Sequence, residues 1–324
     1  MARRVVLVTG ATGFIGRHLV PRLLAERVSV RVVTRSPDRL PAEWRDVVEM
    51  VVGDLSQPSV QAEATRGIEL IYHLAAEIRD ASRMRMINVE AVRGLMESAV
   101  CAGVNRFVHL SSVGVMGAVR PGIVTESESC RPQNEYERTK LEGEEVVRKY
   151  AQAGVIEAVI LRPTIVFGER KEEDSFLGWL RVVKQRRFVF FGRKAIANYI
   201  YVGDVVEALV RLSDHSFEKL AVYIAAAPIP MTNFVEAMAQ ALGVPVPKRH
   251  APRWVGYIVG AFGEVAQRLF RISTPLTVSR VRTLSSQTEF CGKSLLEDLS
   301  LTFPFGWRRG LELTVQGYQR SDRL

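Results

Sequence analysis

The sequence is poor in cysteine, and the three cysteines that it has stand far apart. Cys101, Cys130 and Cys291 form no CxxC pair. A disulfide framework and a cysteine-based zinc site are therefore disfavoured, and we expect a reducing compartment, the cytoplasm. The five histidines show no HExxH-like spacing, so we predict no metal site.

Long apolar runs are missing as well. The run at residues 5–8 gives way at once to a glycine-rich turn, which favours a buried strand over a signal peptide. The longest apolar stretch, residues 254–263, is far shorter than the about 20 residues that a bilayer-spanning helix needs. We expect no transmembrane segment. Three environments stay open for an amphipathic helix over residues 254–270: a peripheral membrane contact, the substrate lobe or a dimer interface.

Positive charge exceeds negative charge, with 44 Lys and Arg against 35 Asp and Glu and a net charge of +9. The cations are spread along the chain, with a denser stretch at residues 181–194, and no basic tail or nucleic-acid motif is present. We therefore expect a small-molecule substrate and no nucleic acid. The charge is also compatible with phosphorylated ligands and anionic membrane surfaces.

The first half of the chain alternates short β-rich apolar runs with helical patterns, at about 30 residues a repeat. This order is typical of a parallel sheet covered by helices on both faces. The predicted strands are residues 5–8, 28–34, 47–53, 70–74, 106–111 and 158–162, with a seventh at 198–202 or 221–225. The predicted helices are residues 16–26, 87–102, 136–153 and 203–213.

The alternation of apolar runs and helical patterns is interrupted after Gly168 by a segment rich in charged and aromatic residues. We predict an α/β protein with a Rossmann-type, doubly wound parallel sheet of about seven strands. Residues 1–169 and 195–228 would form the dinucleotide-binding domain. Residues 170–194 and 229–324 would form a smaller, mostly helical substrate lobe.

A glycine-rich turn joins the first predicted strand to the first helix. Free backbone amides at a helix N-terminus attract a pyrophosphate, and glycine lets the phosphate and the helix approach closely. The spacing is GxxGxxG, not the GxGxxG of the standard dinucleotide fingerprint. We predict that the turn binds the cofactor through Gly10, Thr12, Gly13, Phe14, Ile15 and Gly16.

The second predicted strand should end beside the adenosine ribose. No carboxylate stands there to bind a 2'-hydroxyl; Arg35 and Ser36 follow instead, with Arg39 nearby. A guanidinium binds a 2'-phosphate bidentately, which favours NADP over NAD. NAD stays open, because Arg35 is also compatible with a solvated loop cation.

Tyr136 and Lys140 stand four residues apart, which places both side chains on one face of a helix. A phenol with a pKa near 10 needs about 4 kcal/mol of stabilisation of its charged form to act as a base near pH 7. A cation about 4 Å away supplies that order of energy. Ser112, at the end of the fifth predicted strand, could orient a substrate oxygen toward Tyr136.

These residues and several others stand in the order found in one known family. The matching pieces are Thr9-Gly10-Ala11-Thr12-Gly13-Phe14-Ile15-Gly16, Gly53-Asp54-Leu55, His73-Leu74-Ala75-Ala76, Asn88, Ser111-Ser112, Tyr136-Glu137-Arg138-Thr139-Lys140, Arg162-Pro163-Thr164-Ile165-Val166-Phe167-Gly168 and Tyr201-Val202-Gly203-Asp204-Val205. The chain resembles the extended short-chain dehydrogenases/reductases, also grouped as the NAD-dependent epimerase/dehydratase family.

The resemblance implies roles for further residues. Asp54 and Leu55 would contact the adenine, Ala75 and Ala76 would line the cofactor cleft, and Pro163 would lie near the nicotinamide amide. Ser112, Tyr136 and Lys140 would form the catalytic triad, with Asn88 supporting it. A homodimer formed through a helix bundle is also implied.

The sequence departs from parts of the family. Met116 replaces the tyrosine that many sugar-nucleotide members carry, and Val113-Gly114 replace the Asp-Glu pair of the dehydratases, which disfavours dehydration. The tail resembles the branch of the 3β-hydroxysteroid dehydrogenases and dihydroflavonol reductases. The pieces of that likeness are residues 274–277, 293–299, 305–307 and 310–311.

Three functions stay open. The first is an NADP-linked oxidoreductase acting on an apolar alcohol or ketone. Five aromatic residues either line its substrate pocket or belong to the hydrophobic core: Phe176, Trp179, Phe188, Phe190 and Phe191. The second is a sugar-nucleotide epimerase. Its substrate phosphates would bind the basic stretch Arg181, Lys184, Arg186, Arg187, Arg193 and Lys194, although these cations are equally compatible with a solvated surface. The third is a dinucleotide-binding subunit without turnover.

Overall fold

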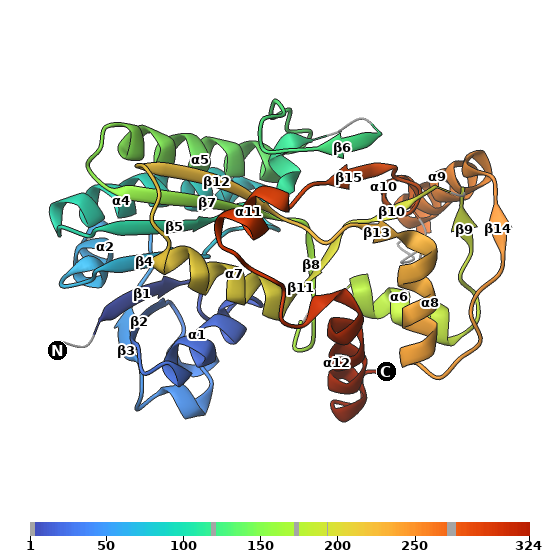
Figure 1. Ribbon diagram of the computed structural model, residues 1–324, viewed down its shortest axis with the longest axis horizontal. Helices are drawn as coiled ribbons and strands as arrows, with labels where there is room; N and C mark the ends of the chain where they lie inside the picture. The colour runs from blue at the N-terminus through green and yellow to red at the C-terminus, as the bar shows by residue number, and fades with distance from the viewer. Residues whose placement is uncertain (1–3, 118–120, 172–174, 193, 271–276) are drawn as a thin grey trace.

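A seven-stranded parallel sheet forms the centre of the protein (Figure 1). The structure is a computed structural model and describes residues 4–117, 121–171, 175–192, 194–270 and 277–324. The strands run in the order β3-β2-β1-β4-β5-β7-β12, and every neighbouring pair is parallel. Their bounds are β1 (Val5–Thr9), β2 (Ser29–Thr34), β3 (Glu49–Val52), β4 (Leu70–His73), β5 (Arg106–Leu110), β7 (Glu157–Pro163) and β12 (Leu220–Ala225). The predicted Rossmann-type sheet is confirmed.

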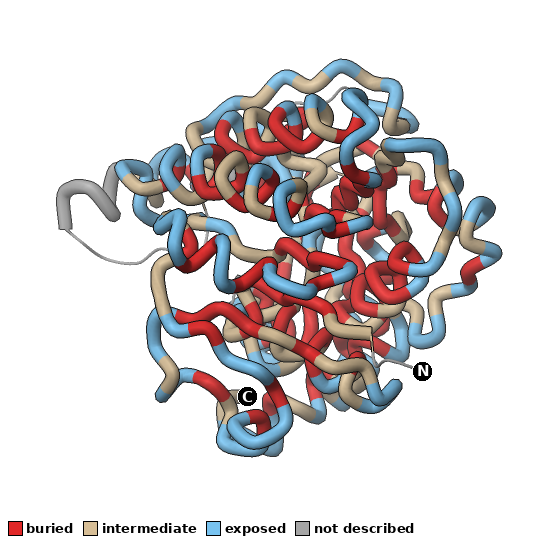
Figure 2. The backbone as a smooth tube through the Cα atoms, turned by 90° about the vertical axis from the view of Figure 1, so that its left-hand side faces the viewer, coloured by how far each residue is buried: buried red, intermediate tan, exposed pale blue. Residues whose placement is uncertain are grey.

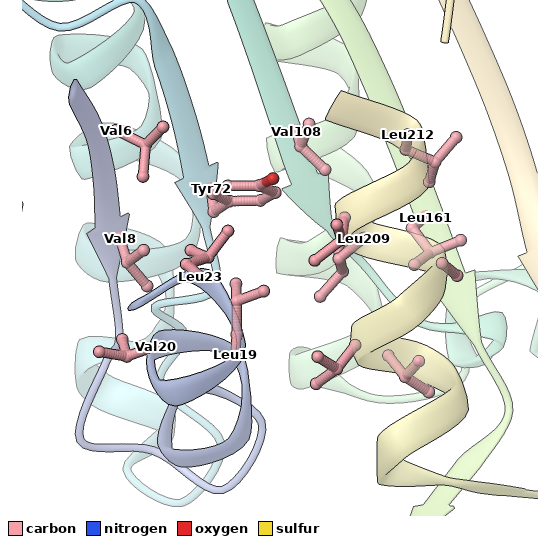
Figure 3. Packing of buried hydrophobic residues seen from close by; sticks show 14 of the residues in the cluster. Val6, Val8, Leu19, Val20, Leu23, Tyr72, Val108, Leu161, Leu209 and Leu212 are labelled. Carbon is pink, nitrogen blue, oxygen red and sulfur yellow. The ribbon is translucent and has the colours of Figure 1, made fainter. Parts of the chain in front are cut away.

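Helices cover both faces of this sheet, as the near-continuous apolar strands require. In β1, Val6 and Val8 face one layer and Leu7 faces the other, and all three are buried. The helices of the first layer are α1 (Gly16–Ala25) and α7 (Val202–Asp214); Figure 3 shows their leucines packed against the strands. The helices of the second layer are α2 (Pro58–Thr65), α4 (Ala91–Cys101) and α5 (Glu135–Gln152).

Most predicted elements lie within two residues of their predicted bounds, with two differences in the helices. The pattern over residues 87–102 is divided into a π-helical turn, η3 (Met86–Glu90), and α4. Helix α2 was not predicted, because its eight residues are too few to show a clear helical period.

The seventh strand is β12, one of the two predicted alternatives. The other alternative contains β11 (Tyr199–Tyr201), which pairs with β8 (Ile165–Phe167) in a separate two-stranded sheet. Both candidates are short and apolar. The choice between them depends on which one reaches the free edge of β7, and that pairing is non-local.

A second apolar cluster lies beyond β8 and β11, and it includes Phe167, Phe176, Tyr199 and Phe234. Its helices and their neighbours are α6 (Ser175–Lys184), α8 (Met231–Ala241), α9 (Arg253–Phe270), α10 (Val278–Leu284) and α12 (Gly306–Arg320). Figure 2 shows the buried residues gathered along the strands and the inward faces of the helices. The predicted division into two domains stays a prediction, and one element of the second part, α11 (Lys293–Asp298), packs Leu295 into the cluster of the sheet.

The remaining elements are short. They are η1 (Pro37–Arg39), η2 (Ala42–Trp44), α3 (Ala81–Arg85), η4 (Val113–Met116), β6 (Gly122–Val124), β9 (Phe190–Phe191), β10 (Ile196–Ala197), β13 (Ile229–Pro230), β14 (His250–Ala251) and β15 (Thr288–Phe290). Arg193 and residues 274–276 of the noted tail lie outside the described residues. No helix in the described part of the chain is both long and apolar enough to cross a bilayer.

Candidate cofactor and active site

The turn between β1 and α1 has the close packing that a dinucleotide site needs. A Cβ atom at Gly16 would lie 2.4 Å from the carbonyl oxygen of Gly10, so only glycine lets α1 begin this close to the turn. Gly10 has a φ of 69°, and a Cβ there would lie 2.7 Å from the backbone nitrogen of Ala75. Helix α1 begins without a side-chain cap and without an acidic residue in its first turn, so its N-terminus stays attractive to an anion.

A cleft of about 250 Å³ lies against this turn, at the carboxyl ends of the strands. Such an edge is where ligands bind in open α/β sheets. Nine of the predicted cofactor residues line it: Gly10, Thr12, Gly13, Arg35, Ser36, Asp54, Leu55, Ala75 and Ala76. Arg39, which was considered with Arg35 and Ser36 for the 2'-phosphate, also lines the cleft. The remaining lining residues were not predicted to bind the cofactor; they are Thr9, Val33, Thr34, Gly53, Leu74, Glu77 and Ile87.

The end of the cleft at Arg35 and Asp54 combines both signs of charge. Arg35 is exposed and its Nη1 lies 3.7 Å from Oδ2 of Asp54, while Arg83 lies 3.6 Å from the same oxygen. Burial raises the pKa of Asp54, but the hydrogen bonds from Ser56 and the charges of the two arginines outweigh it and hold this pKa below its usual value. Arg35 is thus placed beside the cleft, with a carboxylate already next to it.

Three other predicted cofactor residues take different positions. Phe14 packs against the second apolar cluster, its ring lies edge-on to His18 of α1, and the tip of the ring would lie 3.2 Å from a Cβ at Gly168. Ile15 lies between the two apolar clusters. Pro163 ends β7 and is buried, and it is not among the residues that line the cleft.

Helix α5 carries Tyr136 and Lys140 one turn apart near its N-terminus, where Asn134 caps it by accepting a hydrogen bond from the Glu137 amide. Tyr136 is partly exposed. Burial raises the pKa of the Tyr136 phenol, and the nearby Glu137 raises it further. Among the groups of the protein, burial and Glu137 thus determine the direction of this shift, and a lowering of the pKa by Lys140 together with an oxidised nicotinamide stays a prediction.

Lys140 is almost completely buried, with 3% of its surface exposed. Its ammonium group donates a hydrogen bond to the Leu110 carbonyl oxygen, 2.7 Å away at the end of β5, and lies 3.5 Å from Nε2 of His109. Burial lowers the pKa of Lys140 to about 8, with Glu144 opposing the change. A buried lysine whose pKa is lowered in this way is typical of a functional site.

Two histidines beneath Lys140 were missed as site residues in the sequence analysis. The rings of His73 and His109 stack with centroids 5.4 Å apart, and Nδ1 of His73 shares a 2.9 Å hydrogen bond with Oγ1 of Thr9. Burial and the Lys140 charge lower the pKa of His73 to about 3 and lower that of His109 well below its usual value. Both rings are neutral near pH 7, which leaves Lys140 as the cation of the trio.

Ser112 follows β5, and its hydroxyl accepts a hydrogen bond from the Gly114 amide at 3.0 Å. A Cβ at Gly114 would lie 3.3 Å both from Oγ of Ser112 and from Cγ of Glu137, so the Ser112 turn packs against the start of α5. The structure thereby brings Ser112 close to the helical turn that contains Tyr136.

Asn88 joins three segments at the base of the site. Its amide nitrogen donates to Oγ1 of Thr139 and to the Glu77 carbonyl, both at 3.0 Å, and its Oδ1 accepts from the Glu77 amide at 2.8 Å. The π-helical turn that carries it packs so tightly on α5 that a Cβ at Gly143 would lie 2.4 Å from the Asn88 carbonyl oxygen. Asn88 therefore fixes α5 relative to the cleft.

A buried ion pair attaches the other side of α5 to β7. Nε and Nη2 of Arg162 donate to the two carboxylate oxygens of Glu144, at 2.9 and 2.6 Å. Arg148 gives Glu144 a second cation at 3.4 Å. The pair raises the pKa of Arg162 against the effect of burial.

A second cavity, of about 160 Å³, lies beside the second apolar cluster. One of its lining residues, Ile165, follows Pro163 by two positions in the sequence. Its lining is mixed: Ile165, Phe176, Trp179 and Tyr199 are apolar or aromatic, and Lys171, Arg280 and Thr283 are polar. Phe188, Phe190 and Phe191, which were predicted to line a pocket or the core, are in the core of this lobe.

None of the predicted phosphate-binding cations that the structure describes lines the second cavity. Lys184, Arg186 and Arg187 are exposed at the end of α6, and Arg181 donates to the Arg323 carbonyl oxygen. No group of His, Cys, Asp or Glu suited to a metal ion occurs among the described residues.

The comparison with protein families gives one match over most of the chain. The model of the family "NAD dependent epimerase/dehydratase family" matches residues 6–225. Apart from Val5, these residues include all seven strands of the central sheet.

Curated relatives include two enzymes of different activity. The N-acetyl-alpha-D-glucosaminyl-diphospho-ditrans,octacis-undecaprenol 4-epimerase of Escherichia coli O157:H7 is 24% identical, over 96% of this chain and 94% of its own length. The 3 beta-hydroxysteroid dehydrogenase/Delta 5-->4-isomerase of Mycobacterium tuberculosis H37Rv is 32% identical, over 77% of this chain and 74% of its own length.

Among solved structures, MoeE5 in complex with UDP-glucuronic acid and NAD is similar over 98% of this chain and 99% of its own, with a TM-score of 0.74 and 26% identity. The crystal structure of gox2253 has a TM-score of 0.80 at 23% identity, over 99% of this chain and all of its own. The second likeness supports the fold only.

Proposed function

Because the chain belongs to the NAD-dependent epimerase/dehydratase family, we propose that it interconverts an alcohol and a ketone with a nicotinamide dinucleotide. Membership confirms the resemblance found in the sequence and the prediction of an enzyme of the extended short-chain dehydrogenase/reductase type. The observation that carries the proposed reaction is the buried Lys140, one helical turn from Tyr136, on a helix fixed beside the glycine-turn cleft.

The glycine turn and the residues lining the cleft fit a dinucleotide, because Gly10 and Gly16 let the turn and α1 pack closely and the uncapped N-terminus of α1 keeps amides available to an anion. When bound, the nicotinamide accepts or supplies the hydride. Tyr136 would transfer the proton at its hydroxyl to or from the substrate oxygen. Lys140 would stabilise the charged phenolate, and Ser112 would hold the substrate oxygen.

We further propose NADP as the preferred cofactor, with NAD as the alternative. The support is local: Arg35, Ser36 and Arg39 border the adenosine end of the cleft, where a 2'-phosphate would lie. The MoeE5 structure contains NAD, and Asp54 already lies beside Arg35. Both facts favour NAD, so the preference for NADP depends on whether Arg35 exchanges Asp54 for a phosphate.

An apolar alcohol or ketone is the proposed substrate. The aromatic walls of the second cavity support it, as does the likeness to a hydroxysteroid dehydrogenase. The second candidate is a sugar-nucleotide epimerase, supported by Lys171 and Arg280 in the same cavity, where two cations could meet a diphosphate, and by the likeness to the undecaprenol-linked epimerase.

The test compares two tyrosines on helix α5. Tyr136→Phe should lower turnover of NADPH with the best substrate from a panel of ketones by at least about 100-fold, with the cofactor Kd unchanged. Tyr150→Phe is the matched control, because the Tyr150 hydroxyl bonds only to Glu97 among its described partners. Equal turnover by Tyr136→Phe and the wild type would reject the acid/base role.

Product analysis separates the three functions. Net change of NADPH with the ketone panel identifies an oxidoreductase. Conversion of UDP-sugars into their 4-epimers without net cofactor change identifies an epimerase. Tight cofactor binding without turnover of either panel identifies a non-catalytic subunit. The homodimer and the cytoplasmic location stay predictions.

A further inference from the structure

The first part of α9 has its apolar face turned to solvent. Its large apolar side chains point to solvent: Trp254 is 64% exposed and Phe262 is 71% exposed, and Tyr257, Ile258 and Val259 are exposed between them. Trp254, Ile258 and Phe262 are spaced four residues apart, so they form one stripe.

Glycines form the opposite, inward face of this helix. Gly256 and Gly260 are buried, and a Cβ at Gly260 would lie 2.8 Å from the Val278 backbone nitrogen at the start of α10. The protein therefore holds α9 through its smallest residues and presents its largest ones outward. Such an exposed apolar stripe marks an interaction surface.

Basic residues predominate in the sequence around the stripe. Between residues 244 and 287 the sequence has seven Lys and Arg residues and one acidic residue, Glu264. Glu264 is already engaged, because its Oε1 accepts a hydrogen bond from the Val278 amide at 3.0 Å. Lys248 and Arg249 are exposed just before α9, and Arg282 is exposed on α10 beside it.

We propose that this surface, the α9 stripe with its flanking cations, docks the protein on a bilayer that contains anionic lipid. An aromatic stripe flanked by Lys and Arg is the pattern of a helix lying in the interfacial plane of a membrane. A second copy of this chain fits less well, because a symmetric contact would bring the two sets of cations together. Figure 1 shows α9 and α10 at the end of the molecule remote from β1 to β3.

The proposal is independent of the proposed reaction, although the two surfaces adjoin. Arg280 and Thr283, which line the second cavity, belong to α10, and α10 packs against α9. Docking would thus bring the cavity close to the bilayer, where an apolar alcohol or ketone would dissolve.

The test is cosedimentation of the full chain with vesicles. The wild type should bind vesicles of phosphatidylcholine with roughly one third phosphatidylglycerol, and should bind pure phosphatidylcholine much more weakly. Trp254→Ser/Phe262→Ser should reduce the partition coefficient at least about tenfold by removing apolar area. Lys248→Gln/Arg249→Gln should reduce it by roughly tenfold or more at low salt.

Two controls keep the result interpretable. Val47→Ser/Ile123→Ser removes two similarly exposed apolar side chains elsewhere and should bind vesicles like the wild type. Each variant must keep the wild-type melting temperature and cofactor affinity, and each is examined by light scattering. Failure of the wild type to bind anionic vesicles overturns the proposal. So does a change from dimer to monomer in Trp254→Ser/Phe262→Ser with vesicle binding unaltered, which would assign the stripe to a second copy.

Discussion

Replacing Lys140 by methionine should abolish the proposed activity and yet stabilise the protein at neutral pH. Lys140 is 3% exposed, and burial lowers its pKa from the ordinary 10.5 to about 8. The folded protein therefore holds this ammonium group at a cost. Methionine has a similar length and no charge, so it removes the cost while filling the same space.

The size of the effect follows from the pKa and from one hydrogen bond. Lowering the pKa from 10.5 to about 8 corresponds to about 3 kcal/mol of unfavourable free energy for the charged form. The variant loses the bond from Nζ to the Leu110 carbonyl, which costs about 1 kcal/mol. A net gain of about 2 kcal/mol, at an unfolding entropy of roughly 0.7 kcal/mol/K for a chain of this length, raises Tm by about 3 °C.

The difference between variant and wild type should depend on pH. Below pH 8 the lysine is charged in both the folded and the unfolded chain, so the full cost is present. Between about pH 8 and 10.5 the folded lysine has lost its proton while the unfolded one still binds it, so the wild type gains stability as pH rises. Above this range the advantage of methionine disappears.

Calorimetry and urea unfolding at pH 7, 9 and 10.5 test this reasoning. Lys149→Met, an exposed substitution on the same helix, should change neither Tm nor its pH dependence. A Lys140→Met protein that is less stable than the wild type at pH 7 would refute the reasoning, and so would a stability difference that does not change with pH. Those results would mean that Lys140 is stabilised by its surroundings and held for structural reasons.

Three more predictions concern the same site. Glu144→Leu should lower the free energy of unfolding by about 3–5 kcal/mol, because it leaves Arg162 with no carboxylate among its described partners. Arg162→Met should lower it by less, because Glu144 still pairs with Arg148. Urea unfolding ranks the two variants, and the reverse order would contradict this reasoning. Gly143→Ala should lower the free energy of unfolding by at least about 2 kcal/mol and also lower kcat, since its Cβ would lie 2.4 Å from the Asn88 carbonyl oxygen. An unchanged free energy of unfolding would show that α5 can shift to make room. Arg35→Ala should weaken NADPH binding about 10- to 100-fold and NADH binding less than about threefold; equal losses in a fluorescence titration would remove the basis for NADP.

Most strands of the sheet, the glycine turn and the candidate catalytic residues could be predicted from the order of the amino acids. Strands such as β1 and β4 are short apolar runs bounded by turns, and Gly10, Gly13 and Gly16 meet a local backbone requirement. Signals of this kind depend on neighbours within a few residues, so the order of residues is sufficient to predict them.

Features that depend on contacts between distant segments could not be predicted in this way and became visible in the folded chain. β12 became the seventh strand because it reaches β7, and His73 and His109 met because β4 and β5 are adjacent. The stripe from Trp254 to Phe262 is exposed because the glycines of α9 take the inward face against α10. Periodicity shows that a helix has an apolar face, but what that face meets depends on packing between elements far apart in the chain.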